Sequence, residues 1–177
     1  IIDIATLRIE KDIRTGQSPE HLDITMNDKF AYVGNIEDST ISVISLKEGR
    51  EVKRMDTFFE PHGFSVLPDD SKVYVSNYGA HEISIINISS HQVAKRLAIG
   101  DVYWASLREP ERYMSEINGI ANPTLSIDGK FIYAADGDSG KMGIIDTTTD
   151  RVVKTLKVGV SPWRAYASPD GLFMLVL

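Results

Sequence analysis

The side chains best suited to chemistry in this sequence are histidines and one tryptophan–arginine pair, and they recur at one kind of position. His62 directly follows a proline, His21 stands two residues after another, and Trp163 with Arg164 directly follows a third. Imidazole can ligate a metal or transfer protons near neutral pH, so His62 is the candidate catalytic group. The simpler alternative is that it caps a strand or hydrogen-bonds a neighbouring carbonyl.

The pair Trp163-Arg164 suggests ligand recognition. Indole and guanidinium groups at adjacent positions could stack on and pair with an anionic planar ligand, or could anchor a protein partner. A tryptophan beside a repeated proline could also do no more than pack inside the fold. The sequence leaves these alternatives open.

The histidines do not form an obvious metal site. His21 lies one position later than His62 relative to its proline. In extended strands, side chains at such positions should point to opposite sides. We therefore expect no ligand pair and predict no metal site. His81 and His91 fall in polar segments, where a solvated surface role is expected.

Composition excludes several classes of protein. The chain has no cysteine, which excludes disulfides, thiolate metal sites, iron–sulfur clusters, c-type haem attachment and a cysteine nucleophile. Lys and Arg number 19 against 25 Asp and Glu, a net charge of −6. A nucleic-acid-binding protein would show a basic patch, so we expect no nucleic acid as partner. No segment approaches the roughly 20 apolar residues of a transmembrane helix.

Two sequence elements repeat through the chain and set its architecture. Copies of the first, which begins IIDIATL, are 1–16, 43–58, 85–100 and 144–159. Copies of the second, which carries the prolines, are anchored at Pro19, Pro61, Ile120 and Pro162. Successive copies of the first start 42, 42 and 59 residues apart, and those of the second 42, 59 and 42. Both elements therefore indicate a unit of 42 residues and one insertion of 17 residues.

Each unit divides into four short apolar or alternating runs, which are typical of strands and not of helices. In the second full unit the runs are 62–66, 72–76, 82–87 and 93–99. Tight-turn residues separate the first two runs of every unit: Asn27-Asp28, Asp69-Asp70, Asp128-Gly129 and Asp170-Gly171. A unit of about 40 residues with four strands is typical of a β-propeller blade. We therefore predict an all-β chain of four-stranded antiparallel blades.

Several motifs make the units resemble the YVTN family of β-propeller repeats. They include Tyr74-Val75-Ser76-Asn77, Ser168-Pro169-Asp170-Gly171, Ile144-Ile145-Asp146-Thr147 and Lys154-Thr155-Leu156-Lys157-Val158-Gly159. The resemblance covers nearly the whole chain except the insertion. It implies a propeller fold but is weak for function, because the family includes surface-layer proteins, binding modules and relatives of haem d1 propellers.

The strand count amounts to four blades, divided in an unusual way. The predicted divisions are a half blade (1–16), full blades (17–58, 59–100 and 118–159), an insertion (101–117) and a half blade (160–177). The terminal halves could pair and close a four-bladed ring. Alternatively, the chain is a section of a larger propeller, with seven or eight blades. We favour the section, because a raw apolar strand at a sheet edge is an aggregation liability.

Propeller topology places the post-proline residues at the mouth of the central channel. The insertion should emerge on the same face, and it carries aromatic and arginine residues typical of interface anchors: Trp104, Arg108, Arg112 and Tyr113. Long loops in compact domains usually have a function. We therefore expect the insertion to bind a partner or cover a ligand.

Two functions follow as expectations, and whether the chain is an enzyme stays open. The first is an extracytoplasmic binding or scaffold module that binds a protein partner or small ligand through the channel mouth and residues 101–117. The second, implied by the resemblance, is the propeller portion of a periplasmic redox enzyme or haem-binding protein. In it, His62 would be a ligand or acid–base group and Arg164 would hold a cofactor carboxylate. A lactone-hydrolysing propeller is weaker, since it needs an acidic metal cluster. A periplasmic or extracellular location follows from the resemblance alone, because the sequence shows no signal peptide.

Overall fold

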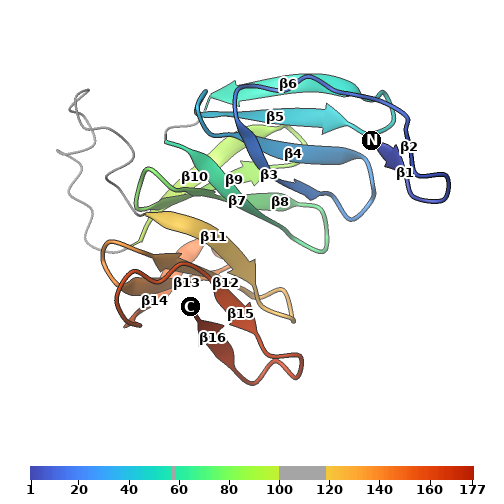
Figure 1. Ribbon diagram of the computed structural model, residues 1–177. Coiled ribbons are helices and arrows are strands. Elements are labelled where there is room, and N and C mark those ends of the chain that lie inside the picture. Colours follow the sequence, from blue (N-terminus) through green and yellow to red (C-terminus); the bar gives the residue numbers. More distant parts are fainter. Residues whose placement is uncertain (57–58, 100–118) are drawn as a thin grey trace.

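The computed structural model describes residues 1–56, 59–99 and 119–177, and every regular element in these ranges is a β-strand. Three sheets contain four consecutive antiparallel strands each, and a two-stranded sheet lies at either end of the chain. Figure 1 shows the sheets stacked side by side and rotated relative to one another, as the blades of a propeller are. The prediction of an all-β propeller with four-stranded antiparallel blades is confirmed.

The strand bounds follow the repeat closely. The first four-stranded sheet contains β3 (Pro19–Ile24), β4 (Phe30–Asn35), β5 (Thr40–Ser45) and β6 (Arg50–Asp56). The second contains β7 (Pro61–Val66), β8 (Lys72–Asn77), β9 (Glu82–Asn87) and β10 (Gln92–Ala98). The third contains β11 (Ile120–Leu125), β12 (Phe131–Asp136), β13 (Lys141–Asp146) and β14 (Arg151–Lys157). The terminal pairs are β1 (Ile2–Asp3) with β2 (Arg8–Ile9), and β15 (Ala165–Ala167) with β16 (Met174–Val176).

The apolar core lies between neighbouring sheets. One buried cluster joins the first and second sheets and includes Tyr32, Ile41 and Val73. A second cluster joins the second and third sheets and includes Ile85 and Ile132. Strands β8 and β9 are buried almost throughout, because sheets cover both of their faces. Strands β4 and β5 are buried between the second sheet and the N-terminal segment around Ile13. The outer strands β6, β10 and β14 alternate between partly buried and exposed residues.

The terminal half blades do not pair with each other. Strands β1 and β2 pair only with each other among the described strands, and so do β15 and β16. In Figure 1 the first pair lies beside the first sheet, whereas the second pair lies beyond the third sheet at the opposite end of the stack. The alternative of a closed four-bladed ring is therefore wrong, and the chain forms a section of a larger propeller.

Side-chain hydroxyls of one inner strand donate hydrogen bonds to main-chain carbonyls of the inner strand in the next sheet. Ser65 in β7 donates its hydroxyl to the carbonyl of Pro123 in β11 at 3.0 Å. At the equivalent position one sheet later, Thr124 donates to the carbonyl of Ala165 in β15 at 2.7 Å. These bonds hold neighbouring inner strands together at the centre of the propeller.

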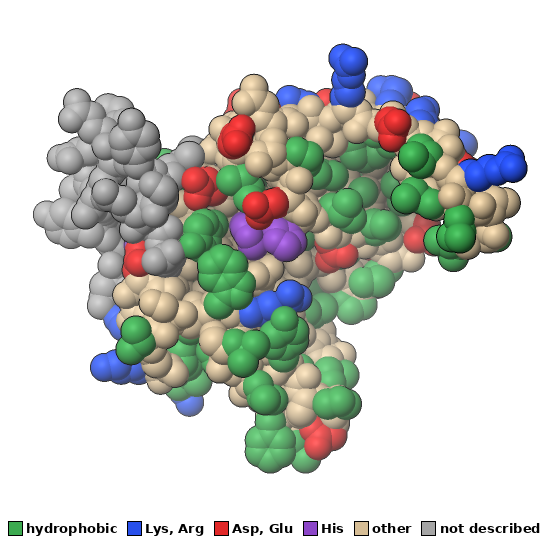
Figure 2. Space-filling model, viewed as in Figure 1, with side chains coloured by type: hydrophobic (Ala, Val, Ile, Leu, Met, Phe, Trp, Pro, Cys, Tyr) green, Lys and Arg blue, Asp and Glu red, His purple; other side chains and the backbone are tan. Residues whose placement is uncertain are grey.

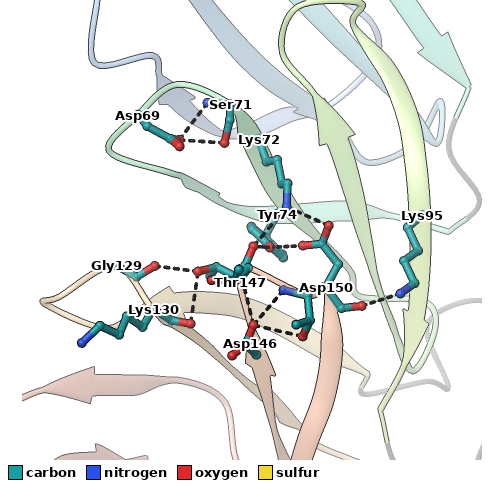
Figure 3. Close-up of polar contacts among 12 residues, drawn as sticks. Asp69, Ser71, Lys72, Tyr74, Lys95, Gly129, Lys130, Asp146, Thr147 and Asp150 are labelled. Carbon is teal, nitrogen blue, oxygen red and sulfur yellow. Dashed lines mark hydrogen bonds and ion pairs between the residues drawn. The ribbon is translucent and has the colours of Figure 1, made fainter.

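A second tie between sheets joins a strand tyrosine to a turn of the next sheet. The Tyr74 hydroxyl lies 2.5 Å from Asp150 Oδ1, and Lys72 Nζ lies 2.8 Å from the other oxygen of the same carboxylate. Figure 3 shows both side chains reaching from β8 toward the turn between β13 and β14. The equivalent Tyr32 hydroxyl lies 2.7 Å from Nδ1 of His91. The expected solvated surface role of His91 is therefore wrong, because its ring completes this tie.

The described residues contain no helix with the length and apolar character needed to cross a membrane. The insertion predicted at 101–117 lies outside the described residues.

Candidate functional site

The candidate site lies where the inner strands begin, which is the end that propeller topology is expected to place at the mouth of the channel. Ser18, Glu60 and Ser161, which each precede a repeat proline, adopt positive φ angles of 51°, 48° and 48°. The pairing of each complete inner strand then shifts register just after the turn, for example between Pro61 and Phe64. A bulge of this kind redirects side chains and breaks strict alternation. The residues inside this bulge, such as His62, can therefore face the mouth.

His62 is buried and held by the next sheet. Its Nδ1 donates a hydrogen bond to the carbonyl of Ala121 at 2.8 Å, which assigns the ring proton to that nitrogen in the neutral tautomer. Its Nε2 lies 3.2 Å from Glu20 Oε2. Burial lowers the pKa of His62, and His21 lowers it further, although the Ala121 bond and Glu20 oppose the shift. The lone pair of Nε2 is therefore available toward Glu20.

His21 lies against His62, contrary to the sequence expectation. The two ring centroids are 4.2 Å apart, and His21 Nε2 is 3.9 Å from Glu20 Oε2. The expectation that the two histidines point apart is wrong because it compared positions along a regular strand. The residues belong to different sheets, and each inner strand has a register shift at this point.

Gly63 shows how closely the inner strands approach here. It occupies the position in β7 that His21 occupies in β3. A Cβ atom on Gly63 would lie 2.6 Å from the carbonyl oxygen of Ala121, a severe clash with backbone. A side chain fits at this level between β3 and β7, but none fits between β7 and β11. The imidazole pair is thus confined to the junction of the first two sheets.

Glu20 was placed at the mouth with the other post-proline residues by reasoning from the sequence, but it was not selected as a site residue. Its carboxylate, with one nitrogen from each of His21 and His62, forms a group of three donor atoms within 4.8 Å of one another. Glu20 directly follows Pro19, just as His62 follows Pro61, so the repeat alignment carried the signal. Figure 2 shows histidine side chains in the middle of one face, bordered by carboxylates and hydrophobic groups.

Aromatic rings from two further segments surround His62. The Trp163 ring lies edge-on at 5.8 Å from the His62 ring, and the Tyr78 ring lies 5.7 Å from it. Trp163 and Tyr78 are themselves 5.4 Å apart, in a T-shaped arrangement favoured by the ring quadrupoles. Trp163 keeps 47% of its surface exposed. Sequence reasoning found Trp163 but missed Tyr78, which lies in the loop between β8 and β9.

Arg164 directly follows Trp163 and is exposed. Its guanidinium carbon lies 4.8 Å from the centroid of the Tyr166 ring, in a cation–π contact. The last residue, Leu177, pairs with this segment: its carbonyl accepts from Trp163 N at 2.6 Å, and its N–H donates to the Arg164 carbonyl at 2.9 Å. The backbone of both predicted binding residues is therefore fixed by pairing at the end of β16.

Acidic groups add negative charge to the mouth. Burial raises the pKa of Glu60, and the nearby Glu20 raises it further. Burial and Glu60 likewise raise the pKa of Tyr78. A raised pKa favours the protonated form of each group, and a protonated carboxyl or phenol can donate as well as accept hydrogen bonds.

His81 lies outside this cluster, and its expected surface role is wrong. Its Nδ1 donates to the buried carboxylate of Asp136 at 2.9 Å, and this bond raises the pKa of His81. The predicted site residues of the insertion, Trp104, Arg108, Arg112 and Tyr113, lie outside the described residues.

Comparison with solved structures supports the fold. The chain matches a structure of hydrazine synthase from Kuenenia stuttgartiensis with a TM-score of 0.82 and 22% identity, over 99% of this chain and 47% of that one. It matches a functionally unknown protein from Desulfotomaculum acetoxidans with a TM-score of 0.71 and 17% identity, over 93% of this chain and 50% of that one. The chain thus spans about half the length of these two relatives.

Comparison with known families and curated proteins completes the assignment. A search of the curated proteins finds no match. The family described as YNCE-like beta-propeller matches residues 1–170, which agrees with the repeat, the four-stranded sheets and the motifs of the YVTN type. The chain belongs to the YNCE-like beta-propeller family.

Proposed function

We propose that this propeller section is a binding module that holds a small planar ligand carrying an acidic group at the channel mouth. The observation that carries the proposal is the group of three rings from His62, Tyr78 and Trp163, which come from separate segments and lie within 6 Å of one another. Rings gathered at the start of rigid strands form a surface for stacking.

Arg164 supplies the group that would recognise the acid. Its guanidinium follows Trp163 directly, is exposed, and is held over the Tyr166 ring. Guanidinium groups bind carboxylates through two parallel hydrogen bonds, and their contact with an aromatic ring limits the entropy lost on binding. A ligand ring against Trp163 and an acidic substituent toward Arg164 would use both neighbours at once.

The test uses Trp163 as its own reporter. The chain has 2 tryptophans, so Trp104→Phe leaves Trp163 as the sole indole. In this background we would titrate benzene- and pyridine-carboxylates, with the matching amides as uncharged controls. We expect saturable changes in fluorescence with the carboxylates and weaker ones with the amides.

The variant Arg164→Gln should weaken carboxylate binding by about 10–100-fold, because a hydrogen bond to a charged group contributes about 1.5–3 kcal/mol. Amide binding should stay as it was. Equal affinities for acids and amides, or unchanged acid binding by Arg164→Gln, would contradict the proposal.

The broader proposal includes a protein partner and the insertion. A contribution from residues 101–117, through Trp104, Arg108, Arg112 and Tyr113, stays a prediction; its test is deletion of the segment followed by the same titration. An extracytoplasmic location belongs to the same proposal and rests on the family resemblance. Fractionation of cells that express the full-length natural protein would test it.

In the redox alternative, His62 alone would be the haem ligand or acid–base group. The geometry instead favours a role for His62 together with Glu20. The His62 side chain is 9% exposed, and its Nε2 faces Glu20. Axial ligation of haem by His62 would therefore require the Glu20 carboxylate to move away. A Soret band in the purified protein would favour the redox alternative over the binding module.

A further inference from the structure

We propose that Glu20, His21 and His62 form a binding site for one divalent transition-metal ion of the Zn²⁺ type. The site goes beyond the planar ligand of the proposed function and does not depend on it. The donor atoms are a carboxylate oxygen and two imidazole nitrogens, all within 4.8 Å of one another.

The distances from Glu20 to the two histidines are close to those around a tetrahedral ion. Bonds of about 2.0–2.2 Å from zinc to nitrogen or oxygen place neighbouring ligand atoms roughly 3.3–3.6 Å apart. The Glu20 carboxylate oxygen lies 3.2 Å from His62 Nε2 and 3.9 Å from His21 Nε2, on either side of that range. The three donor atoms lie within 4.8 Å of one another, so a pair at that limit would have to close by about 1 Å. The side chains of Glu20 and His21 are 52% and 45% exposed, which leaves both free to rotate toward His62.

His62 is already oriented as a metal ligand. Its Nδ1 donates to the carbonyl of Ala121, which fixes the ring and directs the lone pair of Nε2 toward Glu20. Histidines bound to metals commonly donate their second N–H to a carbonyl or carboxylate in this way. The buried ring thus provides a fixed point, to which the two exposed ligands adjust.

The donor set also selects the class of metal. Imidazole nitrogen suits Zn²⁺, Co²⁺, Ni²⁺ and Cu²⁺, whereas Mg²⁺ and Ca²⁺ prefer oxygen ligands throughout. Two histidines and one glutamate leave a fourth tetrahedral position for water or a ligand atom. Because His21 and Glu20 are exposed at the mouth, that position is accessible from solvent.

The ligands come from two sheets, which gives the site a structural consequence. Glu20 and His21 belong to β3, whereas His62 belongs to β7. A bound ion would cross-link the first two sheets in the folded state only, so saturating metal should raise the melting temperature. Binding and stabilisation are thus two separate readouts.

The first test is titration of the metal-free full chain with Zn²⁺ by calorimetry, followed by Co²⁺ with visible absorption. We expect one equivalent of either metal, a Co²⁺ spectrum of tetrahedral type, and no comparable binding of Mg²⁺ or Ca²⁺. Absence of stoichiometric Zn²⁺ binding to the wild-type chain would overturn the proposal. Equal binding of Mg²⁺ would overturn the assigned donor set.

Variants at the exposed ligands keep the test independent of folding. Glu20→Gln and His21→Ala change exposed side chains, and each should weaken Zn²⁺ binding by more than the ~10–100-fold expected for loss of an outer hydrogen-bond partner. The matched control is His81→Gln, which removes a histidine that binds Asp136 in another part of the chain. Wild-type affinity in Glu20→Gln and His21→Ala would overturn the site.

The metal proposal and the small-ligand proposal fail separately. Titration of the Trp104→Phe variant with aromatic carboxylates in the presence of EDTA tests the small ligand without metal. Zn²⁺ titration of Trp163→Ala tests the metal without the stacking surface, and binding should be retained because Trp163 is not a ligand. Loss of Zn²⁺ binding in this folded variant would contradict the three-residue site.

Discussion

At the scale of single residues, His81 shows how one imidazole can join two sheets. It belongs to the loop before β9 and donates to the carboxylate of Asp136, the last residue of β12. The same carboxylate accepts a hydrogen bond from the Ser139 hydroxyl at 2.6 Å. Asp136 is fully buried, so removal of the imidazole leaves a buried charge with less compensation.

The variant His81→Gln should therefore destabilise the chain in a pH-dependent way. The Asp136 bond raises the pKa of His81 above its ordinary value of 6.5. The stabilisation from protonated His81 is complete below that value and is lost as pH rises through the folded-state pKa. We expect a cost of about 1–3 kcal/mol near pH 5.5 and a smaller one near pH 9, measured by urea unfolding.

The control for this prediction is His91→Asn. Burial lowers the pKa of His91, and Lys53 lowers it further, so its contribution is complete above 6.5 and is lost as pH falls. The two variants should show opposite pH trends in the free energy of unfolding. Parallel trends would contradict the assigned charge states.

The sequence could predict which positions carry chemistry but not which side chains meet. His62 and Trp163 were found because both directly follow a repeat proline. The contact of His62 with His21 was not predictable from alternation, since it spans two sheets and follows a bulge in each inner strand. Tyr78 was missed although the antiparallel pairing of Pro61 with Asn77 places it beside the start of β7, where its N–H donates to the Glu60 carbonyl at 2.9 Å.

At the scale of the elements, the tie between a strand tyrosine and the next turn repeats from sheet to sheet. Tyr32 in β4 contacts His91, and Tyr74 in β8 contacts Asp150. Burial raises the pKa of both phenols, so they remain protonated and able to donate. His91 and Asp150 also share positive φ angles of 49° and 50°. The same backbone turn thus presents two different hydrogen-bond partners to equivalent tyrosines.

The variant Tyr74→Phe should lower the free energy of unfolding by about 1.5–3 kcal/mol, because it removes a hydrogen bond to a carboxylate. The matched control is Tyr133→Phe, at the equivalent position of β12. Among the described strands, no turn of the β13–β14 kind follows β14, and Tyr133 makes no equivalent tie in the described residues. Chemical denaturation would compare the two, and an equal cost would contradict the tie.

The sequence predicted the strands well because their signals are local. Runs predicted at 62–66, 72–76 and 82–87 match β7, β8 and β9 within one residue, and the run at 93–99 matches β10 with a shift of one. The role of His91 was not predictable, because a polar turn residue looks the same whether it faces solvent or a neighbouring sheet. The residue types in a turn determine its backbone conformation, whereas the contact between His91 and Tyr32 depends on how neighbouring sheets stack.

At the scale of the whole molecule, the sheets form an open series in which each contacts only its neighbours. The second sheet is covered on both sides, by the first and the third, as the two core clusters show. The first sheet has a less complete cover: a hollow of about 710 Å³ separates its inner half from the N-terminal residues and is lined by apolar side chains such as Leu22 and Val33. The free energy of unfolding of such a series is approximately the sum of the intrinsic stability of each sheet and the energies of the interfaces between neighbouring sheets.

Hydrogen exchange should therefore be slowest in the second sheet. We expect amides of β8 and β9 to be the most protected, followed by β12 and β4, and those of the two-stranded terminal sheets to exchange fastest. Peptide-resolved exchange monitored by mass spectrometry would measure this order. Uniform protection across all sheets would instead indicate a single cooperative unit.

The carbonyl ties between inner strands bear on how this propeller could diversify. Ser65 and Thr124 both bond to main-chain oxygens, and every amino acid supplies such an acceptor. After a blade is duplicated, the residues beside these acceptors can mutate without losing the bond to the preceding blade. Each copy can thus acquire its own mouth residue, as Glu20, His62, Ala121 and Trp163 show in the four successive copies. Selection can then change ligand preference one repeat at a time while the common frame is inherited unchanged.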